Sequence, residues 1–357
     1  MTAASTLPVR RVLSDTNPLL CERGGCLRQL DIAYTTWGEL NPNRDNAVWI
    51  LHPLTCSADP SEWWPDFVGP GKPVDPTIHH VVCVNSLGSC YGTTGPASVD
   101  ARTGRPYRSN FPLITLKDVV AVHERVRRHL GLSRIRLGVG GSYGGQQLIE
   151  WMAAAPSLFD HACVIGAGLQ QSPWAVAFNE SQRMALEADP TFLSDAPDGG
   201  MAGLAAARSI AVLSYRSAQV YERTQREVDD AVCDEFRASS YQRHAGAKFT
   251  RRFDAHAYWT LTKAMDSHNP ARGRGQLNEV MGRITTRVLI VALQDDLLFP
   301  RSQLRAAAEA FADGRLVVIE SDFGHDSILT HAGRIGAAIN QFLVDFRSQE
   351  PCHARCI

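Results

Sequence analysis

Ser142 lies in the segment GGSYGG, directly after an apolar run and directly before a run with helical character. A serine hydroxyl becomes a useful nucleophile only when it is held exposed beside a base, and a sharp strand-to-helix turn does this where neighbouring side chains are absent. Gly140 and Gly144 leave that room, and the start of the following helix points free N–H groups at an oxyanion above the serine. The GxSxG pattern predicts a nucleophile elbow; a glycine-rich turn with an ordinary serine is the alternative.

Two further polar side chains follow strand-like runs in the order that a hydrolase-type triad requires, which is serine, acid, histidine. The run RVLIVAL at 287–293 precedes Asp295 and Asp296, and the run LVVIE at 316–320 precedes His325. An aspartate after a strand is commonly a helix cap, and a single histidine is commonly a surface or core residue. Because three elements match in the required order, we predict a Ser–His–Asp site with His325 as the base.

The second half of an oxyanion hole should come from the turn after an earlier strand. The strand-like run AVWIL at 47–51 is followed by HPLT at 52–55. We expect the backbone N–H groups of Leu54 and Tyr143 to be the two donors, and loss of one such donor costs about 3 kcal/mol of transition-state stabilisation. His52 ends the strand and precedes a proline, so a structural role is favoured over a catalytic one.

Strand-like and helical runs alternate along the chain, which predicts an α/β fold with a mostly parallel sheet. Before Ser142 we expect strands at 28–36, 47–51 and 81–85 and an amphipathic helix at 115–130, and after it a strand at 163–166. Residues 171–282 form helix-compatible stretches rich in Ala, Arg, Gln and Glu, without a clear strand. We expect a catalytic domain of residues 1–170 and 283–357 and a helical lid insertion of residues 171–282 that covers the carboxyl ends of the strands.

Composition excludes several classes of protein. The chain has 357 residues, 44% hydrophobic and 20% charged, and a net charge of −1, which gives no sign of binding to nucleic acid or to an anionic membrane. The N-terminus lacks a hydrophobic signal core and no apolar run could span a bilayer, so we expect a cytoplasmic protein. Nine cysteines without Cys-x-x-Cys spacing predict reduced thiols and no metal site. Cys352 and Cys356, with His353, could bind adventitious metal, but a frayed terminus is the favoured interpretation.

Several longer segments resemble the homoserine O-acyltransferase family of the α/β-hydrolase superfamily, and the resemblance covers nearly the whole chain. It is carried by HPLT (52–55), NSLGSCYGTTGPAS (85–98), GGSYGGQQLIEW (140–151), ARSIAVLSYRS (207–217), KAMDSHNPARGRG (263–275), DDLLFP (295–300) and FGHDSIL (323–329). The resemblance implies an α/β-hydrolase fold with an inserted helical lid. It also implies that Ser142 is the nucleophile, that Asp296 rather than Asp295 is the acid, and that His325 is the base.

The same resemblance implies a substrate site formed by Arg208, Tyr215, Asp326 and Thr55. An amino-acid acceptor carries a carboxylate and an ammonium group, so a selective site needs a guanidinium and a carboxylate. Arg208 and Asp326 are such a pair. The alternatives are that Arg208 lies on a solvated helix face and that Asp326 only orients the loop of the histidine.

The activity that the resemblance implies is a ping-pong transfer of an acyl group from acyl-CoA to homoserine, and the frequency of acetyl donors in the family makes acetyl-CoA the expected donor. CoA is then a co-substrate, and no cofactor or metal is expected. The enzymatic alternatives are a succinyl donor, a serine acceptor, or an esterase; a non-catalytic binding protein is the alternative from another class. The sequence departs from the family pattern at Tyr143, Gln146 and Cys56, all near the expected acyl pocket, so the substrate stays open.

The resemblance also implies a homodimer formed through the lids. The apolar residues Ile210, Leu213 and Val220 fall in the lid segment. Their pattern alone leaves open whether they face a partner or the catalytic domain.

Overall fold

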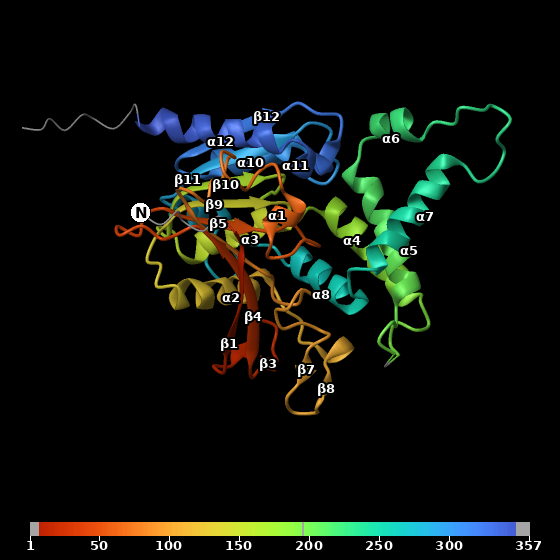
Figure 1. The fold of residues 1–357 in the computed structure, drawn as a ribbon, viewed down its shortest axis with the longest axis horizontal. Helices are drawn as coiled ribbons and strands as arrows, with labels where there is room; N and C mark the ends of the chain where they lie inside the picture. The colour runs from red at the N-terminus through yellow and green to blue at the C-terminus, as the bar shows by residue number, and fades with distance from the viewer. Residues whose placement is uncertain (1–6, 195, 348–357) are drawn as a thin grey trace, which may run out of the picture.

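The computed structural model of the chain describes residues 7–194 and 196–347. Its centre is an eight-stranded sheet (Figure 1) in the order β1-β4-β6-β5-β9-β10-β11-β12. Strands β6, β5, β9, β10, β11 and β12 are parallel, whereas β4 pairs antiparallel with β6 and β1 pairs antiparallel with β4. The strands are β1 (Val9–Asp15), β4 (Leu30–Trp37), β5 (Ala47–Leu51), β6 (His80–Val84), β9 (Ile135–Gly141), β10 (Phe159–Ile165), β11 (Arg287–Leu293) and β12 (Gly314–Ile319). The predicted α/β fold with a mostly parallel sheet is confirmed.

Buried side chains on both faces of the sheet explain why its parallel strands are almost continuously apolar. One core joins the sheet to α2 (Leu116–His129), α3 (Tyr143–Ala154) and α10 (Arg301–Ala310). The other core joins the opposite face to α12 (Ala332–Arg347) and to the region of α1 (Pro60–Trp63). The short remaining elements are β2 (Leu19–Leu20), β3 (Cys26–Leu27), β7 (Val99–Asp100), β8 (Arg105–Pro106), η1 (Arg108–Asn110), η2 (Gly324–Asp326) and α11 (Ser327–Thr330).

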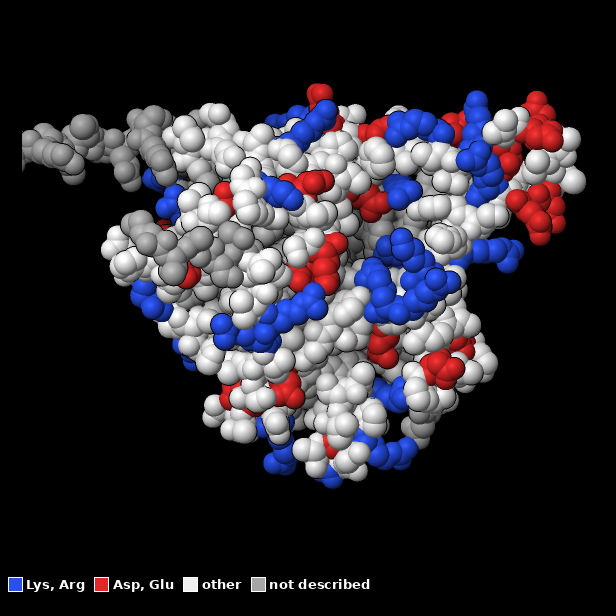
Figure 2. All heavy atoms as spheres, in the orientation of Figure 1, with Lys and Arg blue, Asp and Glu red and all other residues white. Residues whose placement is uncertain are grey.

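The segment between β10 and β11 is helical throughout its regular elements and extends to one side of the sheet (Figure 1). Its described residues form six helices and no strand: α4 (Pro173–Glu187), α5 (Met201–Tyr215), α6 (Ala218–Gln225), α7 (Arg237–Thr250), α8 (Ala255–Asp266) and α9 (Leu277–Gly282). Helix α5 packs against both α4 and α7, and α4 packs against α8. We refer to residues 171–282 as the helical insertion. Charges of both signs are interspersed over much of the face in Figure 2, as expected for a nearly neutral chain.

The sequence analysis does not predict strand β1. None of its seven side chains is buried, so its residues lack the alternation that marks a half-buried strand. Backbone pairing along β4, from Val9 opposite Thr36 to Asp15 opposite Leu30, holds this edge in place.

Candidate active site

The turn between β9 and α3 holds Ser142 in a backbone conformation with φ 55° and ψ −123°. L-residues rarely adopt positive φ, and such outliers gather at active sites. A Cβ atom on Gly140 would lie 2.3 Å from the Gly144 carbonyl oxygen, and one on Gly144 would lie 2.0 Å from the Leu51 carbonyl oxygen. Both glycines are therefore required by close backbone approach, as a nucleophile elbow demands.

The structure brings Ser142, His325 and Asp296 together at the carboxyl ends of β9, β12 and β11. His325 Nε2 lies 2.8 Å from Ser142 Oγ, and His325 Nδ1 lies 2.7 Å from Asp296 Oδ2. The other carboxylate oxygen, Asp296 Oδ1, accepts hydrogen bonds from the backbone N–H groups of Leu298 and Phe299 at 2.9 and 3.0 Å. These bonds fix the carboxylate, and the carboxylate orients the imidazole with Nε2 toward the serine.

Burial and charge act in opposite directions on His325. Burial opposes its protonation, but the charge of Asp296, the hydrogen bond to it and the charge of Asp326 together outweigh that effect, so the pKa of His325 is raised above its ordinary value. The imidazole ring also stacks near Phe299, with ring centroids 5.6 Å apart. Asp295, by contrast, is exposed and has φ 59°, at the turn that ends β11.

The oxyanion turn, residues 52–55, follows β5 and faces Ser142 across the active-site cavity. Among the described residues, the backbone N–H groups of Leu54 and Tyr143 donate to no other protein group. They are thus available to an oxyanion. Both ring nitrogens of His52 contact the protein, since Nε2 accepts from the Ser86 N–H at 3.0 Å and Nδ1 lies 2.8 Å from the Pro53 carbonyl oxygen. Burial lowers the pKa of His52 to about 4, which fits the structural role expected of it.

The cavity above Ser142 has a volume of about 80 Å³ and contains every substrate-site residue that the resemblance implied. Ile328 and Leu329 give it an apolar side, and Cys56 lies at its edge. Its full lining is Pro53, Leu54, Thr55, Cys56, Ser142, Arg208, Tyr215, His325, Asp326, Ile328 and Leu329. Space for a small acyl group therefore adjoins one cation and one carboxylate.

Arg208 comes from α5 of the helical insertion and is held by aromatic rings. Its guanidinium carbon lies 5.3 Å from the ring centre of Tyr215 and 4.9 Å from that of Phe249. No carboxylate among the described residues forms an ion pair with it. A half-buried guanidinium without a carboxylate partner among the described residues can bind a ligand carboxylate by two parallel hydrogen bonds.

Asp326 already has a protein partner, which the sequence did not indicate. Arg216 Nε lies 2.9 Å from Asp326 Oδ2, and both side chains are about one quarter exposed. The Arg216 guanidinium carbon also lies 5.2 Å from the ring centre of Tyr241. This ion pair joins the helical insertion to the segment that carries His325. Arg216 holds Asp326 Oδ2, and within residues 7–194 and 196–347 no cation pairs with the other carboxylate oxygen.

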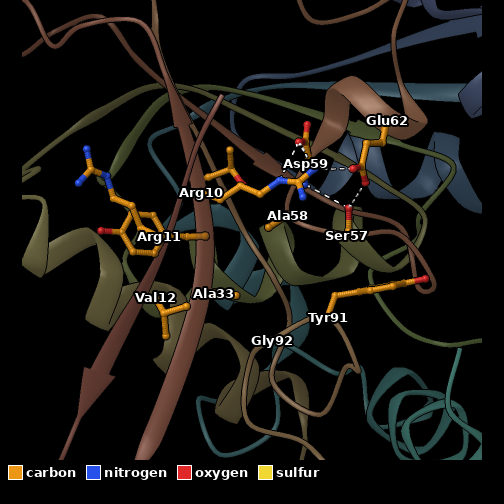
Figure 3. A pocket seen from close by; sticks show the side chains of 12 residues that line it. Arg10, Arg11, Val12, Ala33, Ser57, Ala58, Asp59, Glu62, Tyr91 and Gly92 are labelled. Carbon is orange, nitrogen blue, oxygen red and sulfur yellow. Dashed lines mark hydrogen bonds and ion pairs between the residues drawn. The ribbon is translucent and has the colours of Figure 1, made fainter. Parts of the chain in front are cut away.

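A second arginine that the sequence did not indicate, Arg252, supports the oxyanion turn. Its Nη1 donates to the Thr55 carbonyl oxygen at 2.7 Å and to the Tyr91 hydroxyl at 2.8 Å. Behind the turn, a larger cavity of about 420 Å³ lies between β1, β4 and the residues before α1 (Figure 3). There Arg10 pairs with Asp59 and Glu62 and anchors the chain that follows the turn.

Of the family departures noted in the sequence, Tyr143 and Gln146 are buried and Cys56 is half-buried. Tyr143 and Gln146 both lie on the first turn of α3, and Gln146 Nε2 donates to Gln171 Oε1 at 2.6 Å. This bond links the elbow helix to the start of the helical insertion. Burial raises the pKa of the Cys56 thiol to about 12, so it is a neutral wall of the cavity at physiological pH.

Each of the seven cysteines in the described part of the chain is a free thiol. Within residues 7–194 and 196–347, His, Cys, Asp and Glu nowhere form a group of three that could hold a metal ion. Over the same ranges, no helix combines the length and hydropathy needed to cross a membrane. Cys352, His353 and Cys356 lie outside the described residues.

The fold and the serine elbow are those of an α/β hydrolase, and residues 47–332 match the family model described as alpha/beta hydrolase fold. Homoserine O-acetyltransferase of Cyclobacterium marinum is 38% identical over 327 residues, which cover 92% of this chain and 93% of that protein. The chain belongs to the homoserine O-acetyltransferase family of α/β hydrolases.

Solved structures agree on the architecture. A mutant of esterase E22 superposes with a TM-score of 0.87 at 23% identity, covering 94% of this chain and 100% of that one. Homoserine O-acetyltransferase from Bacillus anthracis superposes with a TM-score of 0.86 at 21% identity. The match covers 96% of this chain and 98% of that one. At these identities the two likenesses establish the fold, which transferases and esterases share.

Proposed function

We propose that this protein transfers the acetyl group of acetyl-CoA to the γ-hydroxyl of L-homoserine and releases CoA. The observation that carries this proposal is the cavity of about 80 Å³ that joins Ser142 and His325 to the unpaired guanidinium of Arg208 and the carboxylate of Asp326. Relatives that are 38% identical over most of the chain are named homoserine O-acetyltransferase. CoA acts as a co-substrate, and the reaction needs no resident cofactor.

In the first half-reaction, His325 removes the proton of Ser142 Oγ, and the oxygen attacks the thioester carbonyl carbon. The Leu54 and Tyr143 N–H groups stabilise the oxyanion of the tetrahedral intermediate. The carbon–sulfur bond then breaks, and CoA leaves as the thiol with the proton from His325. Throughout, Asp296 holds the imidazole and stabilises its charged form.

In the second half-reaction, homoserine enters the site that CoA thiol has left. Arg208 binds its carboxylate, and the free oxygen of Asp326 binds its ammonium group. His325 takes the proton of the γ-hydroxyl, whose oxygen attacks the acyl-enzyme carbonyl. Collapse of the intermediate releases O-acetylhomoserine and returns the proton to Ser142.

The size and charge of the cavity favour acetyl over succinyl as the transferred group. Arg208 is the one Lys or Arg among the described residues that line it, and homoserine requires that cation for its own carboxylate. A succinyl group would need a second cationic side chain for its own carboxylate. The helical insertion acts as a lid that keeps water from the acyl-enzyme, since a transferase differs from an esterase mainly in excluding water.

The test is thiol release from acetyl-CoA and succinyl-CoA with homoserine, with serine or without acceptor, with the product identified by mass. We expect release that depends on homoserine and favours acetyl-CoA. Release that proceeds equally without an acceptor would establish an esterase instead, and preference for succinyl-CoA or serine would correct the substrate.

Replacement of Arg208 by lysine should raise the KM for homoserine about 10- to 100-fold, because a charge-assisted pair of hydrogen bonds contributes roughly 1.5–3 kcal/mol. Formation of the acyl-enzyme from acetyl-CoA should keep its rate, because the guanidinium serves the acceptor. Steady-state kinetics with homoserine and with homoserinol, which lacks the carboxylate, measure this. Arg226→Lys, at an exposed site paired with Glu222, is the matched control. An equal loss with homoserinol would contradict the assignment.

We also propose that the protein works in the cytoplasm as a homodimer formed through the helical insertions. In that segment Leu213 is 50% exposed and Ile210 is partly exposed, whereas Val220 is fully buried. Leu213 and Ile210 can therefore contact a partner, and Val220 packs inside its own chain. Light scattering of the purified protein measures the mass of the assembly.

A further inference from the structure

The C-terminal end of α7 carries positive charge that no neighbouring carboxylate neutralises. From Arg237 to Arg252 the sequence contains no Asp or Glu. Lys248, Arg251 and Arg252 are all exposed, and none of the three forms an ion pair with a carboxylate of the described chain. We call these three residues the α7 basic cluster. Several other arginines of the helical insertion do pair with carboxylates, among them Arg183 with Asp266, Arg216 with Asp326 and Arg223 with Asp322.

The α7 basic cluster is connected to the active-site cavity through Arg252. Arg252 donates to the carbonyl oxygen of Thr55, which lines that cavity. Phe249, on the last turn of α7, has the guanidinium carbons of Arg208 and Arg252 at 4.9 and 5.0 Å from its ring centre. Figure 2 shows blue side chains gathered over the C-terminal end of α7, beside the recess between the helical insertion and the α/β domain.

The three members of the cluster lie within five residues of one another at the end of α7. Lys248 and Arg251 are three residues apart and therefore share one face of the helix end. Arg252 is the member that contacts the wall of the catalytic cavity, through the carbonyl oxygen of Thr55. Lys248 and Arg251 are exposed beside it.

An acyl-CoA donor places its thioester at Ser142 and must place its nucleotide end elsewhere, because a nucleotide is much too large for a cavity of about 80 Å³. The pantetheine arm between them is comparable to four extended residues, about 14 Å. The nucleotide end carries a pyrophosphate and a 3′-phosphate, whose natural partners are Lys and Arg side chains. We propose that Lys248 and Arg251, with Arg252 at the inner end, bind the phosphate groups of coenzyme A. This inference rests on the proposed function.

The larger cavity behind the oxyanion turn is less suited to phosphates. Asp59 and Glu62 both line it and both pair with Arg10. Figure 3 shows Arg10 directed at these carboxylates and the guanidinium of Arg11 directed away from them. Two carboxylates on one wall would repel a polyphosphate, whereas the α7 basic cluster offers cations alone.

The test compares two donors that differ in their phosphates. Acetyl-CoA carries all of them, and S-acetyl-N-acetylcysteamine keeps the thioester but has none. We expect the double substitution Lys248→Glu and Arg251→Glu to lower the ratio of kcat/KM for acetyl-CoA to that for the short thioester about 10- to 100-fold. High salt should reduce the same ratio in the wild type, since exposed charges are screened. Arg252 is left unchanged because it supports the oxyanion turn.

Arg283→Glu is the matched control, because Arg283 is an exposed arginine before β11, at the sheet edge opposite the active site. It should leave the donor ratio as in the wild type. A double variant that keeps the wild-type ratio overturns the proposal, and so does one that loses activity equally with both donors. The double variant could also use acetyl-CoA as well as the wild type does but lose binding to anionic vesicles or to DNA. That result would assign the α7 basic cluster to another anion and would also overturn the proposal.

Calorimetric titration with free CoA separates this inference from the proposed function. If the wild type transfers acetyl to no acceptor, the proposed function fails, whatever the titration gives. If the wild type acetylates homoserine but the double variant binds CoA as tightly as the wild type, the α7 basic cluster is not the phosphate site. Weaker CoA binding by the double variant, with an unchanged circular dichroism spectrum, supports it.

Discussion

Replacement of Ser142 by alanine is expected to abolish the acyl-enzyme and to reduce kcat by about 10⁶-fold, the effect of removing the nucleophile from a serine triad. The reason is geometric: Ser142 Oγ lies 2.8 Å from His325 Nε2, and no other hydroxyl in the described cavity lining has a base at that distance. Mass spectrometry after mixing the wild type with acetyl-CoA should detect the addition of one acetyl group. The alanine variant should keep its unmodified mass.

Ser133→Ala is the control for this experiment. Ser133 is exposed and lies two residues before β9, at the opposite end of the strand that leads to the elbow. Its variant should form the acyl-enzyme at the wild-type rate. An acetyl adduct on the Ser142→Ala protein would mean that another residue is the nucleophile, and peptide mapping would identify it.

Ser142, Asp296 and His325, which the structure brings together, could be picked out from the sequence because a proposed triad of this kind leaves a local pattern. Close backbone approach forces small residues at Gly140 and Gly144, and a buried parallel strand forces an apolar run before each polar residue. The predicted run 287–293 has the same bounds as β11. The serine, acid and histidine therefore stand out as polar residues at the ends of apolar runs.

The arginines that support the site left no such pattern. Arg252 contacts Thr55 across 197 residues, and Arg216 contacts Asp326 across 110 residues. Both lie in an insertion where arginines are common, so residue type alone does not separate a supporting arginine from a solvated one. Their roles depend on how the helices pack on the α/β domain, which the periodicity of a single segment does not encode.

Strand β1 illustrates the same limit for the fold. Val9 and Val12 are exposed, so burial does not select the residue types of this strand. Pairing with β4 supplies its hydrogen bonds, and such tertiary context determines strand formation as much as intrinsic preference does. A strand that is held by its neighbour alone can be recognised only once that neighbour is placed.

Replacement of Asp296 by asparagine should lower the maximal rate by about 10⁴-fold, because the amide no longer fixes the tautomer or stabilises the imidazolium. It should also move the acid limb of the pH profile. Below its pKa, His325 is protonated and cannot accept the proton of Ser142, so kcat/KM falls as the pH falls through that pKa. In the wild type Asp296 raises the pKa of His325, and the limb should lie above about pH 6.5, the ordinary histidine value.

In the Asp296→Asn variant, the carboxylate charge that contributes most to raising the pKa of His325 is gone. Burial, which lowers this pKa, and the charge of Asp326, which raises it, both remain. The acid limb must therefore shift toward lower pH as the rate falls. The Asp295→Asn variant is a close control, because Asp295 is adjacent, exposed and at φ 59°, a conformation that asparagine tolerates. The Asp295→Asn variant should keep the wild-type maximal rate and the wild-type position of the acid limb in the pH profile. If Asp295→Asn causes the large loss of rate instead, the acid has been assigned to the wrong aspartate. If Asp296→Asn lowers the rate but leaves the acid limb of the pH profile where it is, that limb belongs to a group other than His325.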